Sequence, residues 1–376
     1  MHLKQNLIGL AVGLLVVAVV LALPVMGGCA AGVHASGARS RPPVAAAQVR
    51  PIVIGHRGAS GYRPEHTLAA YDLAIAQGAD FVEPDLVMTR DGQLVARHEN
   101  EIGGTTDVAS RPEFAGRKVT RLVDGVPVTG WFTEDFTLAE LKMLRAVERI
   151  PKVRPASTRF DGRFEIATLR EIIELVRRRE AETGRAIGIY PEIKHGSYFA
   201  KIGLPMERAL VNVLHASGYK SQPERVFIQS FEVGTLRTLR GLTALPLTQL
   251  IEPGSSPYDL RSAGSTVTFN DMATPAGLAE IAMYADAVGA GKFFVIPRDP
   301  SGNLMNPTTF VADAHRAGLR VHVWTMRTEE QFLPANLKGD AKAEFAAYLA
   351  AGVDGVFTDQ PDVGRGAVDE FAGISR

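Results

Sequence analysis

The sequence predicts an α/β protein, a TIM-type (β/α)8 barrel with an insertion after the second barrel strand region. From Pro51 onward, short apolar runs alternate with amphipathic helical patterns. The apolar runs are nearly continuous, which is typical of parallel strands whose outer face is covered by helices. The chain has 376 residues, enough for about eight strand–helix units in one barrel of this kind.

Each element follows from its local pattern. Short apolar runs bounded by polar or turn residues predict strands, and apolar residues three and four apart predict helices. The predicted strands cover residues 52–54, 81–87, 94–96, 187–193, 226–230, 247–251, 293–296, 319–324 and 355–358. The predicted helices cover residues 67–77, 138–144, 168–182, 205–217, 232–239, 275–285, 307–317 and 341–351.

One segment interrupts this alternation. Residues 100–165 carry few long apolar runs and many scattered charges. This length is too great for a plain connection between a strand and a helix. We therefore expect an insertion beside the barrel mouth, within a barrel domain at 51–365 that is followed by a C-terminal tail at 366–376.

The N-terminal residues have the pattern of an export signal. Lys4 precedes an apolar stretch at 7–23, and small residues follow it. Met26-Gly27-Gly28-Cys29 resembles the bacterial lipoprotein signal, so a signal peptide at 1–29 and a flexible tether at 30–50 are expected. Ordinary cleavage after Ala31 or Ala38 and an uncleaved anchor are the alternatives. We expect an exported protein, either a cell-envelope lipoprotein or a periplasmic or extracellular protein.

The charge composition limits the partners. The chain has 41 Lys and Arg residues against 41 Asp and Glu residues, a formal net charge of zero. This balance argues against binding to nucleic acid, and membrane contact is expected only through the N-terminal segment. Cys29 is the single cysteine, which excludes an internal disulfide and a cysteine-rich metal site. The oligomeric state is not indicated.

Charged residues gather where predicted strands end. His56 and Arg57 follow the first strand, and Glu83 and Asp85 stand two residues apart in the second. Alternate residues of a strand point to the same face. Two buried carboxylates on one face need a counter-charge, because burying unpaired charges is prohibitively costly.

Three further residues join this set from other strands: His98, Glu192 and Lys194. Carboxylates are hard oxygen ligands, so the acids suit Ca²⁺ or Mg²⁺ better than zinc. Basic residues beside a cation make sense when a phosphate bridges the two. Because histidines exchange protons near neutral pH, the residues indicate metal-assisted phosphoryl transfer or hydrolysis of a small-molecule substrate.

Several motifs extend this pattern along the chain. They are His56-Arg57-Gly58-Ala59, Pro64-Glu65-His66-Thr67, Glu83-Pro84-Asp85 with His98, Pro191-Glu192-Ile193-Lys194, Phe227-Ile228-Gln229-Ser230-Phe231, Val323-Trp324-Thr325 and Gly355-Val356-Phe357-Thr358-Asp359-Gln360-Pro361. Together they resemble the glycerophosphodiester phosphodiesterase signature over roughly residues 51–363. The Pro64–Thr67 motif, residues 105–108 and the long insertion look most like the periplasmic, calcium-dependent bacterial branch.

The resemblance implies a TIM barrel that hydrolyses glycerophosphodiesters, such as glycerophosphocholine and glycerophosphoethanolamine, to an alcohol and glycerol 3-phosphate. It also implies that a neighbouring glycerol hydroxyl of the substrate attacks first, giving a cyclic phosphate that water opens. The roles it assigns are acid and base for His56 and His98, phosphate binding for Arg57 and Lys194, a divalent cation site for Glu83, Asp85 and Glu192, support for Glu65, and lining of the glycerol side for Gln229, Phe231 and Trp324. Ca²⁺ is the expected cation, with Mg²⁺ as the alternative.

Two positions depart from the family pattern. His66 stands where many members have Asn, and Glu99 stands where Asp is frequent. Both substitutes are polar, so we expect them to alter hydrogen bonding around the site and to change metal affinity modestly.

Other histidines are expected to be structural. His195 is interpreted as a bystander on the opposite strand face, His215 and His315 as helix residues near solvent, and His322 as a buried residue of an inner strand. Asp359, after the last strand, fits a mouth residue and a helix cap equally well.

Three alternative functions are open. The same barrel could cleave lysophospholipids by a phospholipase D-like route or cleave polyglycerolphosphate polymers. The third alternative is a non-enzymatic surface-binding lipoprotein.

Overall fold

The structure is a computed structural model, and it describes residues 50–374. The predicted signal peptide, with its lipoprotein cysteine, and the tether up to residue 49 lie outside the described residues. In the described part of the chain, no helix combines the length and apolar character needed to cross a membrane.

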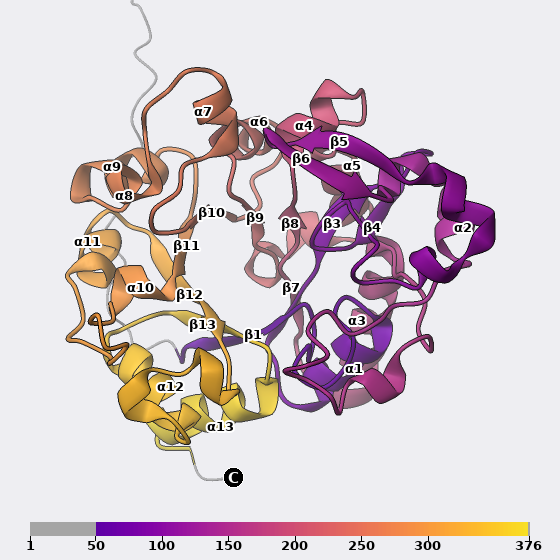
Figure 1. Cartoon of the computed structure of the whole chain (residues 1–376). Coiled ribbons are helices and arrows are strands. Elements are labelled where there is room, and N and C mark those ends of the chain that lie inside the picture. The colour runs from indigo at the N-terminus through magenta and orange to yellow at the C-terminus, as the bar shows by residue number, and fades with distance from the viewer. Residues whose placement is uncertain (1–49, 375–376) are drawn as a thin grey trace, which may run out of the picture. The chain divides into compact units, whose positions relative to one another are not determined.

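A closed ring of parallel strands forms the centre of the described part of the chain (Figure 1). Its eight positions are β1 (Ile52–His56), β2 (Phe81–Glu83) with β3 (Asp85–Met88), β7 (Gly188–Ile189) with β8 (Glu192–Ile193), β9 (Ile228–Ser230), β10 (Leu247–Ile251), β11 (Ala287–Gly291), β12 (Arg320–Met326) and β13 (Gly355–Thr358). The ring closes where β13 pairs with β1. The predicted TIM barrel is confirmed.

Two predicted strands are interrupted. Residues 81–87 divide at Pro84, and residues 187–193 divide at Tyr190 and Pro191. Proline has no backbone N–H and cannot donate to the sheet ladder, so each strand resumes one residue beyond it. The resumed strands β3 and β8 pair in register, with Asp85 opposite Glu192. This register brings two carboxylates side by side.

Helices surround the ring of strands (Figure 1). The longer ones are α1 (Leu68–Ala76), α3 (Leu169–Thr183), α5 (Glu207–Ala216), α6 (Val233–Leu242), α9 (Pro275–Ala282), α11 (Phe310–Arg316), α12 (Ala341–Ala350) and α13 (Pro361–Phe371), and the shorter ones are α4 (Gly196–Lys201), α7 (Tyr258–Ser262), α8 (Phe269–Met272) and α10 (Lys292–Val295). Local sequence explains their ends. Thr168 and Glu171 form a capping box at the start of α3, and Gly184 takes the left-handed conformation after its last turn.

One predicted strand is misplaced. Residues 293–296 form part of helix α10 and its end, and the strand is β11, Ala287–Gly291. The small Ala and Gly side chains of β11 give a weak apolar signal, while the neighbouring phenylalanines give a strong one. Residues 366–371, the first part of the expected tail, continue helix α13, whose Arg365 pairs with Asp80 of the barrel at 3.0 Å.

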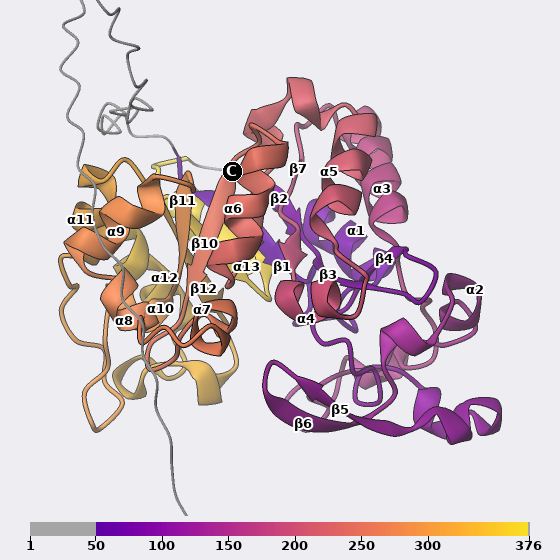
Figure 2. The ribbon, with the colours of Figure 1, turned by 90° about the horizontal axis from the view of Figure 1, so that it is seen from above.

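The insertion is built from short elements. Strand β4 (Leu94–Ala96) pairs antiparallel with β3 and leads out of the barrel, so it is no barrel strand. The insertion then forms a separate hairpin, β5 (Val119–Val123) and β6 (Val126–Gly130), and helix α2 (Leu138–Leu141). Single turns of 3-10 helix occur at Val108–Ser110, Thr133–Asp135 and Thr158–Phe160, and a longer one at Pro112–Arg117. Figure 2 shows the hairpin projecting from the barrel beyond β3 and β4.

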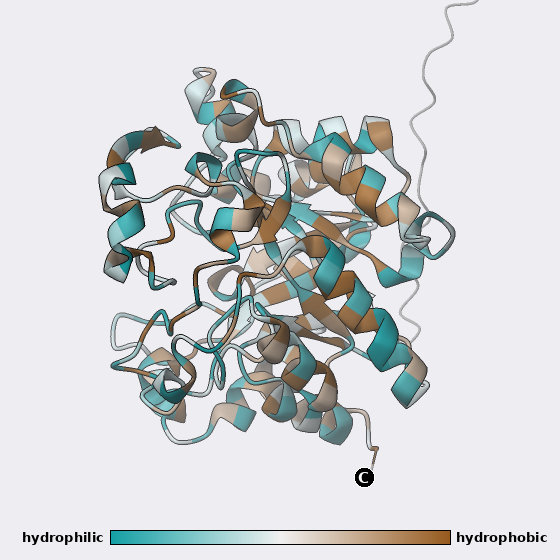
Figure 3. Cartoon of the chain, turned by 90° about the vertical axis from the view of Figure 1, so that its right-hand side faces the viewer, coloured by the Kyte–Doolittle hydropathy of each residue, from teal (hydrophilic) through white to brown (hydrophobic). Residues whose placement is uncertain are grey.

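The hydrophobic residues lie mainly on the strands and on helix faces turned toward them (Figure 3). A distinct layer fills the barrel near the strand beginnings, where Phe81, Tyr190, Phe227 and Phe357 contact one another. His322 is buried against these rings and its Nδ1 lies 2.8 Å from the Tyr190 hydroxyl. The structural interpretation of His322 is confirmed by this burial.

Candidate active site

A cavity of about 630 Å³ opens at the carboxyl ends of the barrel strands. Active sites of TIM barrels are built at this end. Ten of the predicted site residues line it: His56, Arg57, Glu83, Asp85, His98, Glu192, Lys194, Gln229, Phe231 and Trp324. The ten residues come from five of the eight barrel positions and the loops that follow them and, for His98, from the segment after β4.

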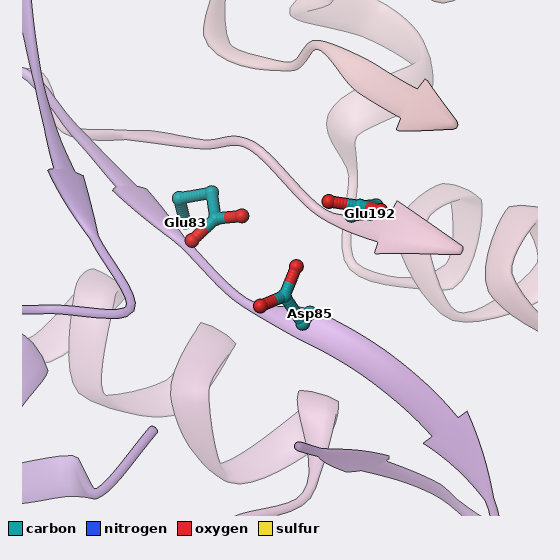
Figure 4. Close-up of side chains that lie close together, drawn as sticks. All are labelled: Glu83, Asp85 and Glu192. Carbon is teal, nitrogen blue, oxygen red and sulfur yellow. The ribbon is translucent and has the colours of Figure 1, made fainter. Parts of the chain in front are cut away.

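Three buried carboxylates occupy its floor. Glu83, Asp85 and Glu192 each offer one oxygen, and these oxygens lie within 4.8 Å of one another. Figure 4 shows the three groups turned toward a common point. The three residues are at most 5% exposed, so water screens their mutual repulsion poorly.

The electrostatics of this acidic triad fit a bound cation. Burial and the neighbouring Asp85 raise the pKa of Glu83 well above its usual range, and burial raises the pKa of Glu192 to about 8. Asp85 Oδ1 and Gln229 Oε1 are buried and lack a hydrogen-bond donor within residues 50–374. A hard divalent cation would satisfy these oxygens and offset the repulsion.

Basic side chains lie directly against the triad. Arg57 has a left-handed backbone (φ 60°), which turns its N–H toward Glu83 Oε2 at 2.8 Å and its Nε to 3.3 Å from Asp85. Lys194 Nζ lies 2.9 Å from Glu192 Oε1 and 3.3 Å from His98 Nε2. Both side chains also line the cavity, so positive charge lies directly beside the three acids.

Each predicted catalytic histidine contacts a carboxylate through Nδ1. His56 Nδ1 lies 2.5 Å from Asp359 Oδ1, and His98 Nδ1 lies 2.5 Å from Glu99 Oε1. These contacts favour a proton on Nδ1 and leave Nε2 as the acceptor. Burial, with Arg57 second, lowers the pKa of His56 to about 4 and that of His98 to about 3. Both rings are therefore neutral at pH 7 before substrate binds.

Glu65 and His66 lie behind the residues that line the cavity. Glu65 accepts hydrogen bonds from Arg57 (3.1 Å) and Arg149, and its supporting role stays a prediction. His66 is fully buried with a left-handed backbone (φ 61°), and its Nε2 lies 2.9 Å from Asp85 Oδ2. Asn and His are both among the residues that adopt this conformation most readily, which explains how His66 fits a position where Asn is frequent.

The predicted glycerol side is divided in space. Phe231 and Trp324 form an edge-to-face pair with ring centroids 5.7 Å apart, and Lys194 lies 5.5 Å from the Phe231 ring. Gln229 lies instead against the acids, because its Nε2 donates to Glu83 Oε1 at 3.0 Å. No feature of the sequence distinguishes the position of Gln229 from that of the two aromatic residues.

Sequence reasoning missed or left open several charged residues at the mouth. Asp359 is the partner of His56, so it is a mouth residue. Arg149 and Arg154 return from the insertion to Glu99 and Asp359, and no local motif marks them. Lys292, Arg298 and Arg327 also line the cavity.

The remaining histidines lie elsewhere. His195 contacts Asp124 of the hairpin at 2.6 Å and lines a neighbouring pocket of about 260 Å³. His215 and His315 lie on α5 and α11, partly exposed, and contact Thr243 and Asp354. His215 and His315 are helix residues near solvent, as predicted, and His195 is not among the residues that line the catalytic cavity.

The fold and the cavity define a class: a TIM-barrel hydrolase whose site is suited to a phosphate diester. The chain belongs to the glycerophosphoryl diester phosphodiesterase family, whose pattern matches residues 56–363. It is 36% identical to glycerophosphodiester phosphodiesterase GDPD6 of Arabidopsis thaliana over 82% of this chain and 84% of that protein. It is 32% identical to the glycerophosphodiester phosphodiesterase of Haemophilus influenzae, with 83% and 88% covered.

Solved structures share the fold. A glycerophosphodiester phosphodiesterase from Agrobacterium tumefaciens superposes with a TM-score of 0.53 at 20% identity, covering 84% of this chain and 99% of that one. An Oleispira antarctica phosphodiesterase, solved with the product sn-glycerol-3-phosphate, gives 0.51 at 22% identity and covers 86% and 98%. The predicted family and enzyme class are confirmed; the periplasmic branch stays a prediction.

Proposed function

We propose that this enzyme hydrolyses small glycerophosphodiesters, such as glycerophosphocholine and glycerophosphoethanolamine, to the alcohol and glycerol 3-phosphate with a bound divalent cation. One observation carries the proposal. The buried triad of Glu83, Asp85 and Glu192 shares one cavity with two histidines that are each held by a carboxylate.

The triad would hold the cation. Its oxygens are hard ligands, and we propose Ca²⁺, with Mg²⁺ as the alternative, because Ca²⁺ accepts irregular oxygen cages more readily. A cation bound there would withdraw electron density from a phosphate oxygen and stabilise the charge that develops during the reaction.

Arg57 and Lys194 would bind the phosphate beside it. Both side chains line the cavity and both lie against the triad. Lys194 also lies 3.3 Å from His98 Nε2, so a phosphate held by Lys194 lies within reach of that ring. The position of this lysine therefore links phosphate binding to proton transfer.

The histidines would move the protons. A neutral ring whose Nδ1–H is donated to Asp359 or Glu99 presents Nε2 as a base, and it can remove the proton of the attacking hydroxyl. The second ring, protonated beside the bound phosphate anion, gives its proton to the leaving alcohol. We propose the glycerol hydroxyl of the substrate as the first nucleophile and water as the second, with the histidine roles exchanged between the steps.

A second substrate class is favoured by one feature of the mouth. The hairpin residues Leu122 and Val126 are 63% and 57% exposed, and Phe293 of the cavity wall is 45% exposed. Val126 also lines the pocket next to the active site. These apolar groups would accept the acyl chain of a lysophospholipid, and release of choline from lysophosphatidylcholine would show that activity.

We further propose that the enzyme works outside the cytoplasm, attached through Cys29 or released. The residues that support this proposal are the apolar stretch at 7–23 and the small residues up to Ala31. Mass spectrometry of the mature N-terminus distinguishes the two forms: a lipid-modified Cys29 supports attachment, and an unmodified terminus after Ala31 or Ala38 supports release.

Product analysis tests the proposed reaction. The protein without residues 1–49 is incubated with glycerophosphocholine in the presence of Ca²⁺, Mg²⁺ or a chelator. The expected result is metal-dependent release of choline and glycerol 3-phosphate. Phosphocholine as the product would mean that the other P–O bond is cleaved, and the proposal would be wrong.

A further inference from the structure

We propose that Arg149 and Arg154, both from the insertion, are positioning residues that hold the two carboxylates behind the catalytic histidines. The inference rests on the proposed roles of His56 and His98. It gives the insertion a function in catalysis besides covering the mouth. The two arginines act on different histidines. Each series of contacts from arginine to carboxylate to histidine is called an arm below, and each arm can be tested separately.

The first arm runs from Arg149 to His98. Arg149 Nη1 and Nη2 donate to the two oxygens of Glu99 at 3.0 and 2.6 Å, and Glu99 Oε1 lies 2.5 Å from His98 Nδ1. The other edge of the same guanidinium donates to Glu65 through Nε (2.8 Å) and Nη2 (2.6 Å). Arg149 thus joins two carboxylates in paired hydrogen bonds that a lysine cannot reproduce.

The second arm runs from Arg154 to His56. Arg154 Nη2 donates to Asp359 Oδ2, and Asp359 Oδ1 lies 2.5 Å from His56 Nδ1. Arg154 also donates to Glu329 (Nε, 2.6 Å) and to the carbonyl of Ser60 (Nη1, 2.9 Å). All three nitrogens of this guanidinium are therefore bonded, two of them to carboxylates.

The backbone of residues 149–154 explains how two arginines so close in sequence reach the carboxylate partners of two different histidines. Val147 N–H donates to the Thr105 carbonyl at 3.0 Å, which ties this segment to the start of the insertion. The chain then turns, with Val153 and Arg154 N–H both donating to the Ile150 carbonyl. One tight turn thus delivers a guanidinium to each side of the mouth.

The arms differ in burial. The side chains of Arg154 and Asp359 are 6% and 2% exposed, whereas those of Arg149 and Glu99 are 28% and 38% exposed. Arg327 also donates to Asp359, at 2.7 Å, so the His56 arm has a second cation. Loss of Arg149 leaves Glu99 free to turn toward water, while loss of Arg154 leaves a buried carboxylate short of one donor.

A carboxylate that is fixed in place keeps the histidine ring in one orientation and one tautomer. The groups around His98 are Glu99, Lys194, Arg57 and Asp85, and those around His56 are Asp359, Arg57 and Arg327. Neither arginine of the insertion contacts a histidine directly. Their effect on the reaction must therefore pass through Glu99 and Asp359.

The test replaces each arginine by Met and by Lys in the otherwise complete chain, with Arg163→Met as the matched control. Arg163 is an exposed arginine of the same insertion whose contact is with the Phe160 ring. We expect Arg149→Met and Arg154→Met to lower kcat for glycerophosphocholine about 10- to 100-fold, the usual effect of removing a partner behind a site residue. KM of Arg154→Met stays near the wild-type value, and the Lys variants recover only part of kcat.

Ring-nitrogen NMR gives a readout that does not depend on turnover. In the wild-type protein the expected His56 and His98 signals are those of the Nδ1–H tautomer. Arg149→Met should mix the tautomers of His98 alone, and Arg154→Met those of His56 alone. Wild-type tautomers in both variants would overturn the inference, whether or not the enzyme cleaves the chosen substrate.

Double variants separate positioning from general stability. If Arg154 acts through Asp359, adding Arg154→Met to Asp359→Asn should lower kcat little further. In the same way, adding Arg149→Met to Glu99→Gln should lower kcat little further. Fully additive losses in kcat would overturn the inference. A wild-type protein that releases no glycerol 3-phosphate would contradict the proposed function instead, and the tautomers would still decide the inference.

Discussion

The two ends of the barrel each bury a histidine, and the pKa of each is lowered to about 4, mainly by burial. At the carboxyl end, His56 contacts Asp359 and lines the cavity. At the other end, His322 contacts the Tyr190 hydroxyl and is packed against aromatic rings. Burial and a lowered pKa are therefore common to His56, which we propose to be catalytic, and to His322, which is packed in the core; the carboxylate partner and the open cavity distinguish His56.

Replacing the histidines tests this contrast with the largest expected effect. His56→Asn and His98→Asn each remove a group proposed to transfer a proton, and such groups contribute about 10²- to 10⁴-fold to the rate. We expect kcat for glycerophosphocholine to fall by that factor with little change in Tm. Activity near the wild-type value in either variant would contradict the assignment.

Neutralising the acidic triad comes next. Glu83→Gln should weaken Ca²⁺ binding at least about tenfold, or about 1.4 kcal/mol, measured by calorimetry. The same change should raise Tm of the metal-free protein at neutral pH, because the raised pKa of Glu83 means that folding must place a proton on this carboxyl beside Asp85 and Glu192, and glutamine avoids that cost. Glu113→Gln, at an exposed position of the insertion, is the control. A lowered Tm together with unchanged Ca²⁺ affinity would show that the triad has only a structural role.

The aromatic end should show the opposite behaviour. His322→Asn removes a ring packed against Tyr190 and Phe227, and we expect the free energy of unfolding to fall by about 1–3 kcal/mol. Because His322 lies outside the lining of the catalytic cavity, kcat of the folded variant should stay within a factor of two or three, roughly. Urea unfolding and steady-state kinetics measure the two quantities. A large loss of kcat without loss of stability would contradict the claim that His322 has only a structural role.

A third histidine has a carboxylate partner but no catalytic cavity, so it tests the effect of the carboxylate alone. His315 Nε2 lies 2.8 Å from Asp354 on the outer surface, and this hydrogen bond raises the pKa of His315. A raised pKa in the folded state stabilises the protein below the unfolded pKa of about 6.5, and that stabilisation is lost as pH rises through the folded value. His315→Asn should remove this pH dependence of the free energy of unfolding, which amounts to less than about 1 kcal/mol for a partly exposed pair. Chemical denaturation at several pH values measures the free energy of unfolding. A variant with the pH profile of the wild type would contradict the prediction.

The sequence was sufficient for residues whose place follows from strand position. His56, Glu83, Asp85 and Glu192 stand in or at the ends of barrel strands, where the alternation of side chains fixes their direction. The boundaries at Pro84 and Pro191 and the strand β11 were harder, since proline interrupts the ladder and small side chains weaken the apolar pattern.

Contacts across long sequence separations were beyond the sequence. Arg149 and Arg154 meet Glu65, Glu99 and Asp359 only because the insertion folds back over the mouth, and the partners of Arg154 lie as many as 205 residues away. An arginine in such a segment looks like any solvated charge. Asp359 fitted two interpretations for the same reason: its partner His56 lies 303 residues earlier in the chain.

One experiment tests the central claim directly: product formation from glycerophosphocholine by the wild type, His56→Asn and His322→Asn, each with Ca²⁺ and with chelator. The expected result is release of choline and glycerol 3-phosphate that requires Ca²⁺, persists in His322→Asn and is lost in His56→Asn. Equal losses in both variants, or release by the wild type that continues in chelator, would contradict a metal-assisted reaction at the carboxyl end of the barrel.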